Sequence, residues 1–101
     1  MKERESFNLA ETRDAIYRRD HGVCRFCGNP VVYPGELAHR IPQTISNLRK
    51  YGKRRVHHPL NLALVCLRKP RCNDGMMIGY DPEAEAELIK SIDNNLEAQD
   101  D

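Results

Sequence analysis

The sequence has no tryptophan, only two phenylalanines and no long apolar run. Because 31% of its 101 residues are charged, the apolar core must be thin, and a chain of this length is expected to form one domain, residues 1–101. No stretch approaches the roughly 20 consecutive apolar residues of a membrane-spanning helix. The charged residues 1–5 are not followed by the apolar segment of a signal peptide. We therefore expect a cytoplasmic protein with no membrane partner.

Acidic residues are missing from residues 37–73, although this window holds nine lysines and arginines. Residues 74–101 reverse the balance, with nine acids and one base, Lys90. A basic segment of this length favours a polyanionic partner, and nucleic acid is the one we expect. The alternative is a solvated surface whose charges are sorted by chance. The nine bases are Arg40, Arg49, Lys50, Lys53, Arg54, Arg55, Arg68, Lys69 and Arg71.

The four cysteines form two pairs, Cys24-x2-Cys27 and Cys66-x5-Cys72, which are separated by 38 residues. In a reducing compartment, closely spaced thiol pairs favour a tetrahedral zinc site. Free buried thiols or disulfides are the alternative. Because all four ligands would be sulfur, the ion has no open coordination position. We therefore expect a structural zinc that takes no part in chemistry.

The pattern of apolar residues and breakers predicts an α+β fold. Asn8 and Glu11 resemble a capping box at the start of a first helix. Asp81 followed by Pro82 is typical of a helix start, and apolar residues recur at fourfold spacing after it. We expect helices at about 9–20, 43–51 and 82–97, strands at 31–33, 36–41 and 61–65, a basic loop at 52–58, and a second cysteine knuckle at 66–72.

The histidines are the candidates for proton transfer. His39 lies in a strand-like phrase inside the acid-free window, and an imidazole with a reference pKa of about 6.5 can take a proton from water at neutral pH. For His58 two alternatives stand, a contact with substrate or metal and a hydrogen bond that orders its loop. His57 is expected to face solvent or a phosphate, and His21 to cap a helix or lie on the surface.

Taken together, the segments that contain the cysteine pairs, His39 and Asn61 resemble the HNH endonucleases of the ββα-metal nuclease group. The resemblance covers about residues 20–78 and implies a short antiparallel hairpin flanked by helices and stapled by the four-cysteine zinc site. It also implies metal-dependent hydrolysis or nicking of DNA. The residues that carry it, in order, are Cys24, Cys27, His39, Pro42, Asn61, Leu62, Cys66, Cys72 and Asn73.

The resemblance implies a role for three of these side chains. His39 corresponds to the general base that activates water, and Asn61 to the asparagine that braces the catalytic loop. Asn73 corresponds to a ligand of a catalytic divalent cation, Mg²⁺ or Mn²⁺. The sequence departs from the family at Ala38, where an Asp or His ligand is common. We expect water or a nearby group to replace it, first His58, then Asp74, then Glu36.

Backbone contacts with DNA are expected from the basic residues of the window, because nothing in the sequence indicates a recognition helix that reads bases. One active site per chain cuts one strand, so double-strand cleavage requires a homodimer or two encounters. The alternatives are a non-catalytic zinc-ribbon module that binds nucleic acid, and an interaction domain whose last helix docks a partner. The expected phosphate contacts are Arg40, Lys53, Arg54 and Arg55.

Overall fold

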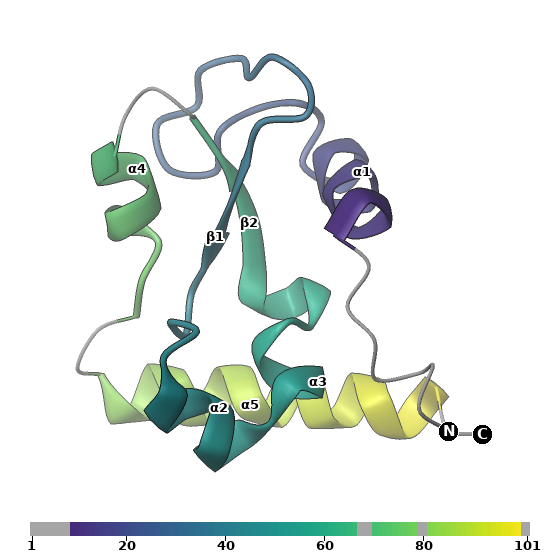
Figure 1. Ribbon diagram of the computed structural model, residues 1–101, viewed down its shortest axis with the longest axis vertical. Coiled ribbons are helices and arrows are strands. Elements are labelled where there is room, and N and C mark those ends of the chain that lie inside the picture. The colour runs from purple at the N-terminus through teal and green to yellow at the C-terminus, as the bar shows by residue number, and fades with distance from the viewer. Residues whose placement is uncertain (1–8, 67–69, 79–80, 100–101) are drawn as a thin grey trace.

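A computed structural model of the protein describes residues 9–66, 70–78 and 81–99. Two short strands form its centre, and helices surround them (Figure 1). The expectation of a small α+β fold is confirmed. In chain order the elements are α1 (Leu9–Arg19), β1 (Glu36–His39), α2 (Ile45–Tyr51), α3 (Lys53–Val56), the 3₁₀ turn η2 (Pro59–Asn61), β2 (Leu62–Val65), α4 (Pro70–Gly75) and α5 (Pro82–Gln99).

The two strands pair antiparallel, with Ala38 opposite Ala63 and His39 opposite Leu62. All four residues of β2 are buried, which explains why this strand is apolar at every position rather than at alternate ones. Helix α1 packs against β2, and α4 packs against β1 (Figure 1). The strand pair is therefore covered from both sides, and His39 occupies the last position of β1.

The apolar core has two parts. The first surrounds the strands and contains Ile16 from α1 and Leu64 from β2, together with buried cysteines. The second joins Ile41 to Leu88 and Ile92 of α5, so the predicted apolar stripe of the last helix is confirmed. The expected start of that helix is also confirmed, because Asp81 Oδ1 accepts a hydrogen bond from the backbone N–H of Ala84 at 3.1 Å.

Asp20, directly after α1, connects the first helix to β2. Its buried carboxylate accepts hydrogen bonds from Arg19 Nε at 2.8 Å, from Arg25 Nη1 at 3.0 Å and from the backbone N–H of Leu64 at 3.0 Å. Burial raises the pKa of this carboxyl, but the hydrogen bonds and the Arg19 charge outweigh it, so the pKa lies below its usual value. The folded protein thus holds Asp20 as a satisfied anion.

Several expected boundaries differ from the structure. Residues 31–33 form no strand, because the backbone groups of Val31 bond elsewhere than to a partner strand. Its N–H donates to the Gly22 carbonyl, and its own carbonyl accepts a hydrogen bond from the Tyr17 hydroxyl. The expected loop at 52–58 contains α3. The strand predicted over 36–41 ends at His39.

Two further differences concern the cysteine and asparagine segments. Cys72 lies on α4 rather than in a knuckle loop, and Asn61 belongs to η2 rather than to the strand that follows it. The proposed capping residue Asn8 lies outside the described residues. Within the described ranges, no helix is both long and apolar enough to cross a membrane.

We predict that Asp20→Asn lowers the free energy of unfolding by about 1–3 kcal/mol near neutral pH, because an amide cannot accept all of the charge-assisted hydrogen bonds. Because the folded-state pKa of Asp20 is lowered, wild type has this advantage above the unfolded-state pKa of about 3.9 and loses it as the pH falls below that value. Urea titrations at pH 7 and pH 3 measure the difference. Asp14→Asn, which removes a partly exposed partner of Arg18, serves as the control and should change stability by less than about 1 kcal/mol. An Asp20→Asn variant as stable as wild type at pH 7 would contradict this role.

Candidate functional site

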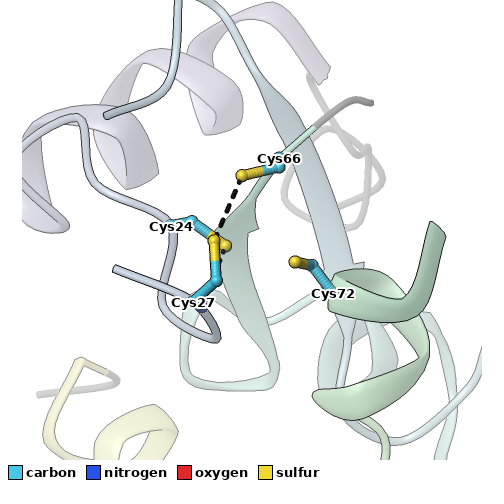
Figure 2. A group of neighbouring side chains, drawn as sticks. All are labelled: Cys24, Cys27, Cys66 and Cys72. Atoms are coloured by element: carbon cyan, nitrogen blue, oxygen red, sulfur yellow. Dashed lines mark hydrogen bonds between the residues drawn. The ribbon is translucent and has the colours of Figure 1, made fainter. Parts of the chain in front are cut away.

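The four cysteine sulfurs form one cluster, with all four atoms within 4.8 Å of one another. Cys24 and Cys27 come from the loop after α1, Cys66 follows β2, and Cys72 lies on α4. Figure 2 shows the four side chains converging on one point between these segments. All four thiols are free, and Cys27 Sγ lies 3.4 Å from Cys66 Sγ, far beyond the roughly 2.05 Å of a disulfide bond.

This cluster fits a tetrahedral zinc ion. Zinc–sulfur bonds of about 2.3 Å place the sulfurs of a tetrahedron about 3.8 Å apart, which agrees with the observed spread. Burial raises the pKa of Cys24, but backbone N–H groups of Cys27, Phe26 and Cys66 outweigh it and lower the value to about 6. The hydrogen bond with Cys27, together with burial and the Cys24 charge, raises the pKa of Cys66 to about 12. The raised pKa values of Cys66 and Cys72 mean that all four sulfurs ionise together only when a cation balances their charge.

The cysteine cluster holds α4 in place. A helix of six residues is not stable alone in water, so its position beside β1 depends on tertiary contacts. Cys72 is fully buried against the strands. Gly75, at the end of α4, lies so close to Phe26 that an added Cβ would come within 2.2 Å of the ring. The loop of the first cysteine pair and the helix of the second therefore pack directly against each other.

Asn61 is fully buried, and both ends of its amide are bonded. Its Oδ1 accepts from the backbone N–H of Ile41 at 2.7 Å. Its Nδ2 donates to the carbonyls of Val56 at 2.7 Å and Ile41 at 3.1 Å. The backbone carbonyl of Asn61 also accepts a hydrogen bond from the backbone N–H of Arg40 at 2.8 Å. One side chain thus ties the segment after His39 to the end of α3.

His39 is half-buried at the end of β1, and its Nε2 lies 3.1 Å from Nδ1 of His57. Burial and the neighbouring His57 lower the pKa of His39 to about 4. Burial, and then the charge of Lys53, also lowers the pKa of His57. Both imidazoles are therefore neutral at pH 7, and a neutral ring has one nitrogen with a lone pair.

His58 points the other way, toward α5, and is buried. Its Nδ1 accepts from the backbone N–H of Leu60 at 3.0 Å, so the hydrogen of the neutral ring lies on Nε2, which donates to Asn95 Oδ1 at 3.0 Å. Both nitrogens are occupied, and neither offers a lone pair to a cation. Of the two alternatives for His58, the geometry supports the one in which it orders the loop.

The remaining expected cation ligands do not form a second cluster. Asn73 and Asp74 are exposed on α4, and Glu36, at the opposite end of β1 from His39, lies 3.4 Å from Arg13. Within the described residues, the four cysteines are the one group of three or more His, Cys, Asp or Glu side chains placed to share a metal. Asn73 lies exposed on α4 next to Cys72, and both ring nitrogens of His58 are already hydrogen-bonded.

The expected phosphate contacts lie in different environments. Lys53 and Arg54 are exposed on α3. Arg55 on the same helix is engaged within the protein, because its Nε donates to Asp93 Oδ1 at 2.6 Å and its Nη1 to the Tyr51 carbonyl at 3.0 Å. Arg40 is half-buried and lines a cavity of about 330 Å³ beside α5. Of the four side chains, Lys53 and Arg54 are the exposed ones.

His57 is the residue of this site that the sequence did not reveal. Its ring contacts His39 edge to face, with an interplanar angle of 74°, a contact that was not part of the expectation that His57 faces solvent or a phosphate. His57 and His58 are adjacent, and the sequence does not indicate which of the two rings meets His39. The turn after α3 sends one ring toward β1 and the next toward α5.

Comparisons of the chain with protein-family models, curated protein sequences and solved structures found no match. Function is therefore inferred from the motifs of the sequence and from the geometry of the site.

We predict that the purified protein contains one zinc ion per chain, and that Cys72→Ser loses it. Zinc binding supplies on the order of 10 kcal/mol of folding free energy in small modules, so this variant, or wild type with a strong chelator, should lose cooperative unfolding. Metal analysis and thermal unfolding measure both effects. His39→Ala is the control and should retain zinc. A wild type that folds equally well without metal would contradict the structural role.

Proposed function

We propose that the protein is a metal-dependent DNA endonuclease of the HNH type, which nicks phosphodiester bonds with His39 as the general base. The observation that carries the proposal is the buried amide of Asn61. The HNH resemblance implies an asparagine that braces the chain next to the base, and Asn61 makes three side-chain hydrogen bonds to the segments on either side of the histidine pair.

His39 can accept a proton, because with a pKa lowered to about 4 its ring is neutral at pH 7 and keeps a lone pair. A general base works best with a pKa near the working pH, so the mechanism requires the pKa of His39 to rise when the substrate binds. As the proton moves to the ring, the water oxygen forms a bond to phosphorus and the bond to the leaving ester oxygen breaks. An approaching phosphodiester brings negative charge, which stabilises the imidazolium that forms.

The cation and the phosphate need their own contacts. A bound Mg²⁺ or Mn²⁺ would stabilise charge on the phosphate and the leaving oxygen, and Asn73 on α4 is the side chain that we assign to it, with water and substrate oxygens completing the shell. Lys53 lies near enough to His57 for its charge to lower the pKa of that residue. An exposed lysine beside the histidine pair suits contact with the DNA backbone.

We predict that wild type relaxes supercoiled plasmid in Mg²⁺ or Mn²⁺, that EDTA stops the reaction, and that His39→Ala reduces the rate at least about 100-fold because the general base is lost. His39 makes one side-chain hydrogen bond, so the variant should unfold within about 1 kcal/mol of wild type. Agarose gels and urea titrations provide the two measurements.

The matched control is His21→Asn, which removes an exposed imidazole at a position with φ of 59°, a conformation that Asn tolerates. It should cleave like wild type. DNA binding without cleavage in either metal would exclude the nuclease and favour the non-catalytic zinc-ribbon module.

We also predict that Lys53→Ala weakens DNA binding and reduces the slope of log affinity against log salt by about one unit, because one phosphate contact is lost. Arg55→Ala should lower the midpoint of thermal unfolding and leave the salt slope unchanged, because Arg55 is bonded to Asp93 and Tyr51. Fluorescence anisotropy at several salt concentrations measures binding. The reverse pattern would place the DNA on another face of α3.

A further inference from the structure

We propose that His57 is a positioning residue for His39: its Nδ1 accepts a hydrogen bond from Nε2–H of His39 and thereby leaves the Nδ1 lone pair of His39 open to a water molecule. That this lone pair takes a proton from water rests on the proposed nuclease function. The tautomer of His39 does not depend on that function and can be measured in a protein that shows no activity.

The pair has the geometry of a ring-to-ring hydrogen bond. The two nitrogens lie 3.1 Å apart, and the rings meet at 74° with centroids 5.2 Å apart. Two neutral imidazoles can share this contact in only two ways, because one nitrogen donates and the other accepts. If His57 were the donor, Nε2 of His39 would be occupied and its Nδ1 would carry the hydrogen. His39 would then have no lone pair left for water.

The surroundings of His57 allow its role as an acceptor. Burial and the charge of Lys53 disfavour the doubly protonated ring, which could only donate at Nδ1, whereas a neutral ring can accept there, as the proposal requires. His57 Nδ1 then takes the hydrogen bond without receiving a proton. When His39 becomes an imidazolium, its Nε2–H remains bonded to the same nitrogen.

The backbone that carries the two histidines is held by one side chain. Asn61 bonds to Ile41 and Val56, which lie two residues after His39 and one residue before His57. The backbone N–H of His57 also donates to Lys53 O at 2.9 Å, closing the turn of α3. The separation of the rings is therefore set by the buried core and not by the two side chains alone.

The test of the tautomer is nitrogen-15 NMR on zinc-loaded, histidine-labelled protein at pH 7. The expected result is that His39 carries its hydrogen on Nε2 and His57 carries its hydrogen on Nε2, with both Nδ1 atoms unprotonated. A hydrogen on Nδ1 of His39 would overturn the proposal, whether or not the protein cleaves DNA.

The test of positioning compares two variants of His57. His57→Leu removes the acceptor and should give His39 a mixture of tautomers, with kcat reduced about 10-fold to 100-fold and KM little changed. His57→Asn places an amide oxygen near the position of Nδ1 and should restore both the single tautomer and most of kcat.

Each outcome separates this proposal from the nuclease itself. If wild type cleaves plasmid and His57→Leu cleaves equally fast with the same His39 tautomer, positioning by His57 is wrong and the nuclease stands. If wild type does not cleave, the nuclease fails, and the NMR spectra of wild type and His57→Asn still decide the tautomer. Thermal unfolding of each variant checks that a loss of kcat does not reflect a loss of fold.

Discussion

The buried amide of Asn61 is the interaction on which the part of the molecule around the end of β1, α3 and η2 depends. It joins the chain that leaves β1 to the end of α3 and to the start of β2 through short hydrogen bonds in a site without exposure to water. Removing the amide would leave backbone groups of Ile41 and Val56 buried without partners, which costs more than a hydrogen bond contributes when intact. The strands can end where they do, with His39 at the edge of the core, because this side chain replaces the next rung of the ladder.

The part of the molecule around α1, the 24–27 loop and α4 also has a small core, and other interactions hold it together. There the cysteine cluster and the Asp20 carboxylate connect α1, the 24–27 loop, β2 and α4 through polar or metal-binding groups. A zinc ion at the cysteines would bring the negative charge of four thiolates into balance and fix a helix too short to persist alone. The cysteine cluster lies near the end of the strand pair where Glu36 faces Val65, and the pair of His39 and His57 lies at the other end.

Electrostatics distinguish the histidine pair from an ordinary surface. Burial lowers the pKa of both rings; His57 adds to this effect on His39, and Lys53 adds to it on His57. Residues 37–73 around them contain basic residues and no acids. Under the proposed function, a polyanionic substrate would supply the negative charge that this segment lacks. The ion pair of Arg55 with Asp93 shows that one of these bases instead connects α3 to α5.

The sequence by itself determined the features that depend on local spacing: the four zinc-suited thiols, the helix that begins after Asp81 with its apolar stripe, the first helix, and the phrases around His39 and Asn61. Tertiary structure alone decided which groups meet across the chain. Residues 31–33 have the composition of a strand, yet Val31 bonds to Gly22 and Tyr17, and no strand forms. His57 and His58 are adjacent in sequence, yet one ring contacts β1 and the other contacts α5. The physical reason is that a hydrogen-bonding side chain is assigned its role by a partner many residues away, and local spacing carries no record of that partner.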